Sequence, residues 1–192
     1  MQELKERIRK EGKVLPGNII KVDGFLNHRI DTELMDHIAE EFGKHFNMDE
    51  VTMILTAEAS GIALSAIVAQ HFGKPMIFAK KAKSDNIEGG LYQSDIFSYT
   101  YKKKVTLLVS KEWMSADDKV LIIDDFMANG EAMRGLCDIV EAAGATLVGI
   151  GCAVEKGFQG GGDRLRAAGV NLKSLAIIES AEPGNIVFRD EE

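Results

Sequence analysis

The chain has few of the residues that mark a specialised class of protein. Its 192 residues include two cysteines, three prolines and one tryptophan. Cys137 and Cys152 lie in apolar segments and are not spaced as metal ligands, so we expect two reduced, buried thiols. The four histidines, at positions 28, 37, 45 and 71, also lack metal-ligand spacing, which argues against a structural zinc site.

Long apolar segments are absent as well. No stretch approaches the roughly 18 apolar residues that would span a bilayer, and the start, MQELKERIRKEGKVL, has no apolar core of the kind found in signal peptides. The net charge of −7 argues against general affinity for nucleic acids or membranes, although a local basic patch could still bind a phosphorylated ligand. We therefore expect a cytoplasmic protein with neither nucleic acid nor membrane as a partner.

Common catalytic and nucleotide motifs are missing too. There is no G-x-x-x-x-G-K-[ST] and no G-x-G-x-x-G after a strand, which excludes a P-loop and an ordinary dinucleotide site. The nucleophile elbow G-x-S-x-G and the zinc motif H-E-x-x-H do not occur either.

The pattern that is present alternates short apolar strands with helices, which predicts a single-domain α/β fold with a mostly parallel sheet. We expect strands at 19–25, 51–56, 75–80, 105–110, 119–124, 146–154 and 174–179, and helices at 2–11, 31–46, 61–73, 130–143 and just before Ala168. Residues 81–104 are polar, with a weak strand signal at 95–101, and are too many for an idle connection. They predict a lid or a binding hairpin.

The stretch VLIIDDFMANGEAM, residues 120–133, carries the strongest chemical signal. Asp124 and Asp125 directly follow a buried run, where they are costly unless something binds them. The turn behind them offers backbone N–H groups and a helix start, which suit a phosphate, whereas carboxylates suit ribose hydroxyls. Side chains alternate along a strand, so one carboxylate is expected to touch the sugar. The alternative is an acidic strand end beside an ordinary turn.

This stretch resembles the motif of type I phosphoribosyltransferases that binds 5-phosphoribosyl diphosphate (PRPP). Five further segments resemble the bacterial xanthine-specific members of that family: FLNHRID (25–31), AEASG (57–61), FAKKAKS (78–84), SYT (98–100) and AVEKGFQGGGDRL (153–165). The resemblance implies a twisted, mostly parallel sheet flanked by helices, as one domain over residues 1–192. It also implies a small hood, roughly residues 1–30 plus a C-terminal segment, and a flexible catalytic loop, roughly 82–104.

The resemblance also implies roles for two turns and the acidic pair. It assigns PRPP binding to Asp124, Asp125, Ala128, Asn129, Gly130, Glu131 and Ala132. It assigns the pyrophosphate loop to Glu58, Ala59, Ser60 and Gly61, and such loops in the family often hold a strained peptide bond. The alternative for this second turn is a plain helix cap by Ser60.

A lysine cluster and the flexible loop are the remaining candidates for the phosphate side. Lys80, Lys81 and Lys83 follow a predicted strand, and a solvated surface is as good an explanation as a phosphate contact; Lys81 is the preferred residue. Ser98 and Tyr99 match the part of the family's loop that closes over PRPP. No side chain is assigned as a catalytic acid or base.

For the base, the resemblance implies contacts from Ile20, Asn27 and Lys156. Lys156 can donate to the 6-oxo group of an oxopurine. Asn27 has both a donor and an acceptor with which to read the 2-position, where xanthine carries oxygen and guanine an amine. Without the resemblance, Asn27 and Lys156 would be unremarkable surface residues.

The expected activity is transfer of the 5-phosphoribosyl group of PRPP to xanthine, giving XMP and pyrophosphate for purine salvage. The resemblance also implies a homodimer and Mg²⁺ bound with PRPP, held by ligand oxygens and water rather than by a cage of protein side chains. Two alternatives stay open: preference for hypoxanthine or guanine, and a non-catalytic regulator that senses PRPP. The net acidic charge and the absence of a helix-turn-helix pattern argue against the regulator.

Overall fold

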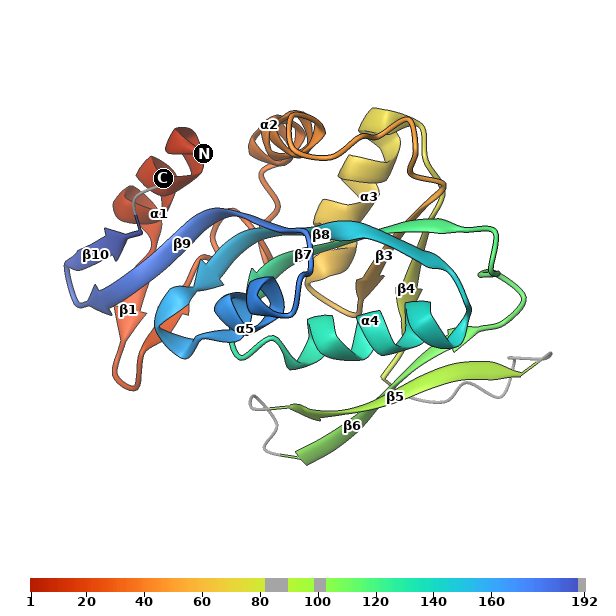
Figure 1. The fold of residues 1–192 in the computed structure, drawn as a ribbon. Coiled ribbons are helices and arrows are strands. Elements are labelled where there is room, and N and C mark those ends of the chain that lie inside the picture. Colours follow the sequence, from red (N-terminus) through yellow and green to blue (C-terminus); the bar gives the residue numbers. More distant parts are fainter. Residues whose placement is uncertain (82–89, 99–102, 190–192) are drawn as a thin grey trace.

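The computed structural model describes residues 1–81, 90–98 and 103–189 (Figure 1). The helices are α1 (Gln2–Glu11), α2 (Thr32–Gly43), α3 (Gly61–Phe72), α4 (Glu131–Ala142) and α5 (Gly161–Ala167), with a 3-10 turn at Gly157–Gln159. The strands are β1 (Lys13–Leu15), β2 (Ile19–Lys21), β3 (Met53–Ala57), β4 (Met76–Ala79), β5 (Leu91–Ser98), β6 (Lys103–Ser110), β7 (Lys119–Met127), β8 (Thr146–Lys156), β9 (Leu172–Glu182) and β10 (Asn185–Phe188). None of the helices in the described ranges is long and apolar enough to cross a bilayer.

A six-stranded sheet forms the centre of the molecule, with the strand order β10-β9-β8-β7-β3-β4. Five neighbouring strands pair in parallel, namely β9, β8, β7, β3 and β4. The edge strand β10 is antiparallel to β9. Residues Val120 to Asp125 of β7 are all buried, as expected for a parallel strand covered on both faces. The predicted α/β fold with a mostly parallel sheet is therefore confirmed.

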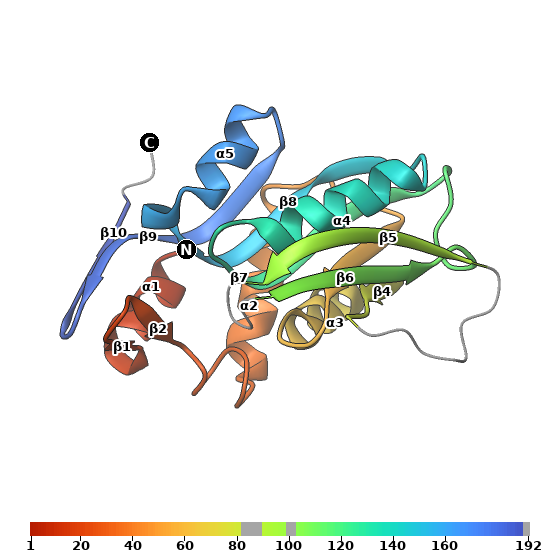
Figure 2. The same ribbon diagram turned by 90° about the horizontal axis from the view of Figure 1, so that it is seen from below.

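Helices cover both faces of this sheet (Figures 1 and 2). Alternate side chains of each strand enter different cores, because successive residues point to opposite faces. Ile54 and Ile123 pack in the core under α1, α2 and α3, whereas Leu55 and Ile122 pack in the core with α4 and the β5–β6 hairpin. The hairpin lies outside the central sheet and continues the layer of α4 (Figure 2).

Several sequence expectations differ from the observed elements. The strand β1 was not expected, and the helix expected at 31–46 ends at Gly43. The strand predicted at 19–25 ends at Lys21, because Asp23 closes a turn in which its carbonyl accepts from the N–H groups of His28 and Arg29. The strand predicted at 174–179 is longer and is followed by β10, which was not foreseen. The weak signal at 95–101 corresponds to β5, which begins at Leu91 and pairs with β6. Residues 82–89 and 99–102 of the expected loop lie outside the described residues.

The order of the strands reverses between β3 and β7. The chain runs from β3 through α3 to β4 on one side, and from β7 through α4 to β8 on the other. Open α/β sheets bind ligands at such a reversal, beyond the carboxyl ends of the strands. The two turns that follow β3 and β7 flank this position, so the fold brings together segments about 70 residues apart.

Candidate active site

A cleft lies at this reversal point. Its walls come from the ends of β3 and β7, the second residue after β4, the start of α4 and the end of β5. The lining residues are Ala57, Glu58, Ser60, Lys81, Ile96, Phe97, Asp124 and residues 126–133. The cleft therefore gathers both expected phosphate turns, the preferred lysine and one residue of the acidic pair.

The turn after β7, residues Ala128–Ala132, has the geometry of an anion site. Gly130 has a φ of 77° and immediately precedes α4, so this position favours glycine. The N–H groups of Asn129 and Gly130 have no hydrogen-bond acceptor among the described residues. The first turn of α4 adds N–H groups without intrahelical partners, together with the positive end of the helix dipole. A phosphate fits this arrangement.

The second turn, Glu58–Gly61, joins β3 to α3. The peptide bond between Glu58 and Ala59 is cis. Ser60 occupies the N-cap position of α3 but makes no side-chain hydrogen bond to the helix, so its hydroxyl does not cap α3 in this structure. Gly61 has no room for a side chain, because a Cβ there would overlap Oδ1 of Asp124 and a threonine hydroxyl of β3. The start of α3 is thus pressed against the acidic residue of the cleft.

The two lysines after β4 have different surroundings. Lys81 lines the cleft, and its backbone N–H donates to Oε1 of Glu58 at 2.5 Å. Its positive charge also acts to lower the pKa of Asp124, against the larger effects of burial. Lys80 instead exchanges backbone hydrogen bonds with Leu108 and lines a separate hollow. Lys83 lies outside the described residues.

The β5–β6 hairpin reaches the cleft at the end of β5. The backbone N–H of Phe97 donates to the Glu131 carboxylate at 3.4 Å, and Arg134 contacts the same carboxylate at 3.3 Å. The Glu131 carboxylate is therefore held by hydrogen bonds from Phe97 and Arg134. Ser98 ends β5 and is described only by its backbone, and Tyr99 lies outside the described residues. Their role in closing the site stays a prediction.

Asp124 and Asp125 have different neighbours although they are adjacent. Asp124 lines the cleft, and its Oδ1 accepts a hydrogen bond from the Asp125 N–H at 3.0 Å. Asp125 is 1% exposed; its Oδ2 accepts from the Asn27 amide at 2.8 Å, and its buried Oδ1 has no hydrogen-bond partner in the described part of the chain. Burial first, and then the charge of Asp125, raises the pKa of Asp124 well above its usual value.

None of the three residues expected at the base lines this cleft. Asn27 uses one of its amide donors to bind Asp125, whose neighbour Asp124 lines the cleft. The Nζ of Lys156 lies 5.4 Å from the ring centroid of Phe126, which lines the cleft, and donates to the Asn18 carbonyl at 3.0 Å. Burial lowers the pKa of Lys156. Ile20, in the N-terminal hairpin, is 7% exposed.

Several residues of the site had no expected role. Phe126 lines the cleft and its ring lies beside the Lys156 ammonium, and the only sequence signal for it was its position after the acidic pair. Arg164 donates to the Asn129 carbonyl at 3.0 Å, and the Gly161 backbone packs against the same turn. The sequence GFQGGGD indicated a turn here but gave no sign of what it would contact.

Comparison with known proteins agrees with this architecture. The model of the phosphoribosyl transferase domain family matches residues 25–168. A protein of Bifidobacterium longum named xanthine phosphoribosyltransferase is 54% identical and covers 98% of this chain and 100% of its own. One of the same name from Lachnoclostridium phytofermentans is 52% identical and covers both chains fully.

A solved structure extends the agreement to the fold. The adenine phosphoribosyltransferase of Giardia lamblia superposes with a TM-score of 0.77 over 93% of this chain and 98% of its own, at 22% identity. At 22% identity, this similarity supports the fold alone. The family match and the full-length relatives show that the chain belongs to the phosphoribosyltransferase family.

Proposed function

We propose that this chain is a xanthine phosphoribosyltransferase, which transfers the 5-phosphoribosyl group of PRPP to a ring nitrogen of xanthine and releases XMP and pyrophosphate. The observation that carries the proposal is that two helix-starting turns, Lys81 and Asp124 line one cleft. The choice of xanthine is supported by relatives of that name, which are about half identical to this chain along its whole length.

The two ends of PRPP would lie at the two turns. The turn after β7 would hold the 5-phosphate through its N–H groups, and the turn after β3, with Lys81, would receive pyrophosphate. During transfer, the bond from C1′ to the pyrophosphate oxygen breaks, the bond from C1′ to the base nitrogen forms, and the ribose becomes electron-poor. Asp124 would accept hydrogen bonds from the ribose hydroxyls and stabilise this positive charge.

The base would lie between Phe126 and the N-terminal hood. Lys156 would donate to the 6-oxo group, because its ammonium lies beside the Phe126 ring at the edge of the cleft. Asn27 would present its carbonyl oxygen and its remaining N–H to the 2-position, since Asp125 holds the other N–H. Ile20 would pack against the ring.

We further propose that Mg²⁺ binds together with PRPP. Such an ion would be held mainly by ligand oxygens and water. The cleft-lining Asp124 would offer carboxylate oxygens to that water, and the buried Oδ1 of the adjacent Asp125, which has no hydrogen-bond partner in the described part of the chain, adds negative charge behind it. When bound, the ion would neutralise charge on the departing pyrophosphate. Calorimetric titration of PRPP with and without Mg²⁺ tests this, and equal affinities would contradict it.

A homodimer is also proposed, as the resemblance implies. Phe78 and Trp113 are 38% and 61% exposed beside a hollow next to the edge strand β4, and a second copy would cover them. Light scattering measures the mass directly, and a monomer at micromolar concentration would contradict this proposal. A cytoplasmic location stays a prediction.

The test of the activity is a PRPP-dependent assay of pyrophosphate release with xanthine, guanine and hypoxanthine in parallel. We expect xanthine to give the highest kcat/KM. If guanine or hypoxanthine is turned over faster than xanthine, that base is the preferred substrate and the proposed xanthine specificity is wrong. PRPP binding without turnover of any base would favour a non-catalytic regulator. The Lys156→Ala variant is expected to raise the KM for the base more than the KM for PRPP, and equal losses would contradict its assignment.

A further inference from the structure

The turn after β7, residues Ala128–Ala132, is called the phosphate turn below. Another turn, residues Gln159–Gly162, leads from β8 into α5 and contacts the phosphate turn. It approaches the phosphate turn backbone to backbone. A Cβ added to Gly161 would lie 2.6 Å from the carbonyl carbon of Asn129 and 2.7 Å from the nitrogen of Gly130. Neither partner is the end of a flexible side chain, so this contact exists only because residue 161 is glycine.

Arg164, in α5, holds the same peptide from the same side. Its Nη2 donates to the Asn129 carbonyl at 3.0 Å, and its Nη1 donates to the Gln159 carbonyl at 3.4 Å. In a trans peptide, the carbonyl and the following N–H point in opposite directions. The carbonyl bound by Arg164 therefore directs the Gly130 N–H to the other side of the turn.

That N–H has no acceptor among the described residues, and Gly130 lines the cleft. The five residues of the phosphate turn, Ala128–Ala132, carry neither a cation nor a hydroxyl group. Their binding capacity lies in the orientation of their backbone and in charges supplied from outside. Arg164 fixes the orientation of the Asn129 carbonyl and adds a positive charge beside the turn.

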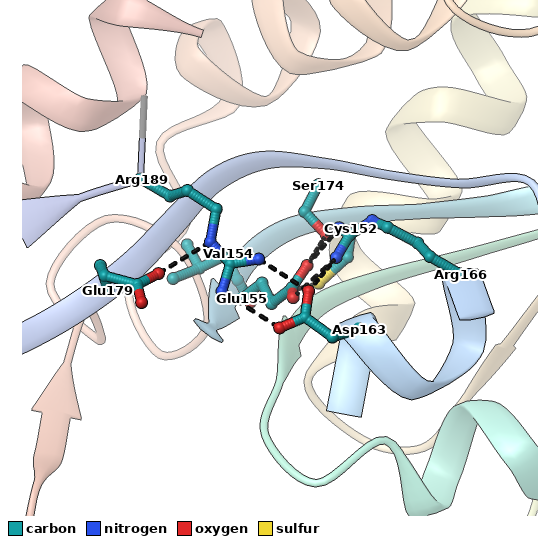
Figure 3. Close-up of polar contacts among 8 residues, drawn as sticks. All are labelled: Cys152, Val154, Glu155, Asp163, Arg166, Ser174, Glu179 and Arg189. Carbon is teal, nitrogen blue, oxygen red and sulfur yellow. Dashed lines mark hydrogen bonds and ion pairs between the residues drawn. The ribbon is translucent and has the colours of Figure 1, made fainter. Parts of the chain in front are cut away.

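Ion pairs hold α5, the helix that carries Arg164, against the sheet. Glu155, at the end of β8, is fully buried and pairs with Arg166 at 2.6 and 3.1 Å, and the Ser174 hydroxyl donates to the same carboxylate (Figure 3). Asp163, on the same face of α5, pairs with Arg189 at 2.7 Å and with Arg166 at 3.3 Å (Figure 3). These ion pairs hold α5 against the sheet, so the helix that carries Arg164 has a fixed position relative to the phosphate turn.

We propose that Gly161 and Arg164 are positioning residues for the 5-phosphate: they shape the phosphate turn from behind and orient its N–H groups toward the ligand. This inference rests on the proposed function, because it assumes that a 5-phosphate binds at this turn. It assigns no contact between Arg164 and the reacting atoms.

The main test compares Arg164→Gln with Arg9→Gln, which removes the same charge from an exposed arginine of α1 that packs against the Phe188 ring. Loss of one charge-assisted hydrogen bond at an exposed site predicts about a fivefold higher KM for PRPP in Arg164→Gln. The KM for xanthine and the melting temperature should stay at the wild-type values, and Arg164→Lys should recover part of the loss by restoring the charge. Arg9→Gln should match the wild type throughout.

A second readout does not require turnover. Ribose 5-phosphate carries the 5-phosphate without pyrophosphate, and its stabilisation of the protein in a thermal shift assay should fall in Arg164→Gln and not in Arg9→Gln. Gly161→Ala should lose the same stabilisation, whereas Gly24→Ala, where an added Cβ meets nothing within 4 Å, should keep it. If Gly161→Ala does not fold, Arg164→Gln still decides the question.

The outcomes separate the two proposals. A wild-type protein that neither turns over PRPP nor is stabilised by ribose 5-phosphate overturns the proposed function. A wild-type protein that does both, together with an Arg164→Gln variant indistinguishable from Arg9→Gln, leaves the function in place and overturns the positioning role. Equal increases in the KM values for PRPP and xanthine would also overturn it, because they indicate a general structural defect.

Discussion

The two turns that line the cleft are alike in position and different in support. Both follow neighbouring parallel strands, both precede a helix, and residues of both line the same cleft. The turn after β7 is supported from outside, by the backbone of Gly161 and by Arg164. The turn after β3 is supported from inside the cleft, where Gly61 touches Asp124 and Glu58 binds the Lys81 N–H.

This difference corresponds to the fates of the two groups in the proposed reaction. The 5-phosphate belongs to both PRPP and XMP, so its turn can keep one shape throughout a reaction cycle. Pyrophosphate leaves, and its turn shares its contacts with the residues that meet the ribose. Changes at the turn after β3 are therefore expected to disturb the ribose and pyrophosphate together, whereas changes behind the turn after β7 should act on the 5-phosphate alone.

The largest effect is expected from Gly61→Ala. The new methyl group would overlap Oδ1 of Asp124, so the carboxylate must move or α3 must shift away from β7. Overpacking of this kind typically costs about 1–3 kcal/mol, and a similar loss in binding would raise the KM for PRPP by about 30-fold. Steady-state kinetics and a thermal melt measure both consequences, with Gly24→Ala as the control. A KM for PRPP equal to that of the control would mean that this turn is independent of the ribose site.

A smaller effect, confined to the pyrophosphate side, is expected from Lys81→Gln. Removing one exposed cation from the cleft should weaken pyrophosphate binding about threefold to tenfold, with less effect at high salt. Lys80→Gln is the matched control, because Lys80 lines a different hollow. Isothermal titration with pyrophosphate and with ribose 5-phosphate separates the two turns. Equal losses for both ligands would show that the turns do not act separately.

The smallest effects are expected on the stability of the ligand-free protein. They have opposite signs for Asp124, which lines the cleft, and for Asp163, in α5 behind the phosphate turn. Asp124 has a raised pKa, so its ionisation costs the folded state stability as the pH rises from 3.8 through the raised pKa. Asp124→Asn should therefore melt higher than the wild type above the raised pKa of Asp124 and show no difference below the ordinary pKa of a carboxyl group.

Asp163, on the α5 side, provides the opposite case. The Arg189 guanidinium holds the pKa of Asp163 below 3.8, so its charge stabilises the folded protein above 3.8, and this contribution is lost as the pH falls through the lowered pKa. Asp163→Asn should therefore melt lower than the wild type at neutral pH. Thermal melts across the pH range measure both variants, and shifts of the same sign would contradict the contrast.

The local parts of the site were predictable from the sequence because each is a contiguous segment. A buried apolar run followed by acidic and small residues predicts the end of β7 and its turn, and AEASG predicts the second turn by the same logic. The reversal of strand order then brings the two turns together, as the α/β pattern predicts once β3 and β7 are taken as neighbours.

The contacts between distant segments were not predictable in this way. Arg164 and Asn129 are 35 residues apart, and Asn27 and Asp125 are 98 residues apart, with no periodic pattern linking either pair. The edge strand β10 was missed because it is short and half-exposed, so its residues lack the continuous apolar run of a central strand. Lys81 was the preferred lysine, but the local sequence gave no physical reason to choose it over Lys80, because their different surroundings depend on the contact between β6 and the residue after β4.

The hydrogen bond between Asn27 and Asp125 links the segment expected to bind the base to the strand end expected to bind the ribose. One carboxylate oxygen of Asp125 is bound to the residue expected to read the base, and the other is buried and has no hydrogen-bond partner in the described part of the chain. The Asp125 backbone in turn binds the carboxylate of Asp124, which lines the cleft. A sugar phosphate bound at Asp124 would act through this chain of contacts on the charge that orients Asn27, and thermodynamic linkage would then require sugar phosphate and base to alter each other's binding by the same factor.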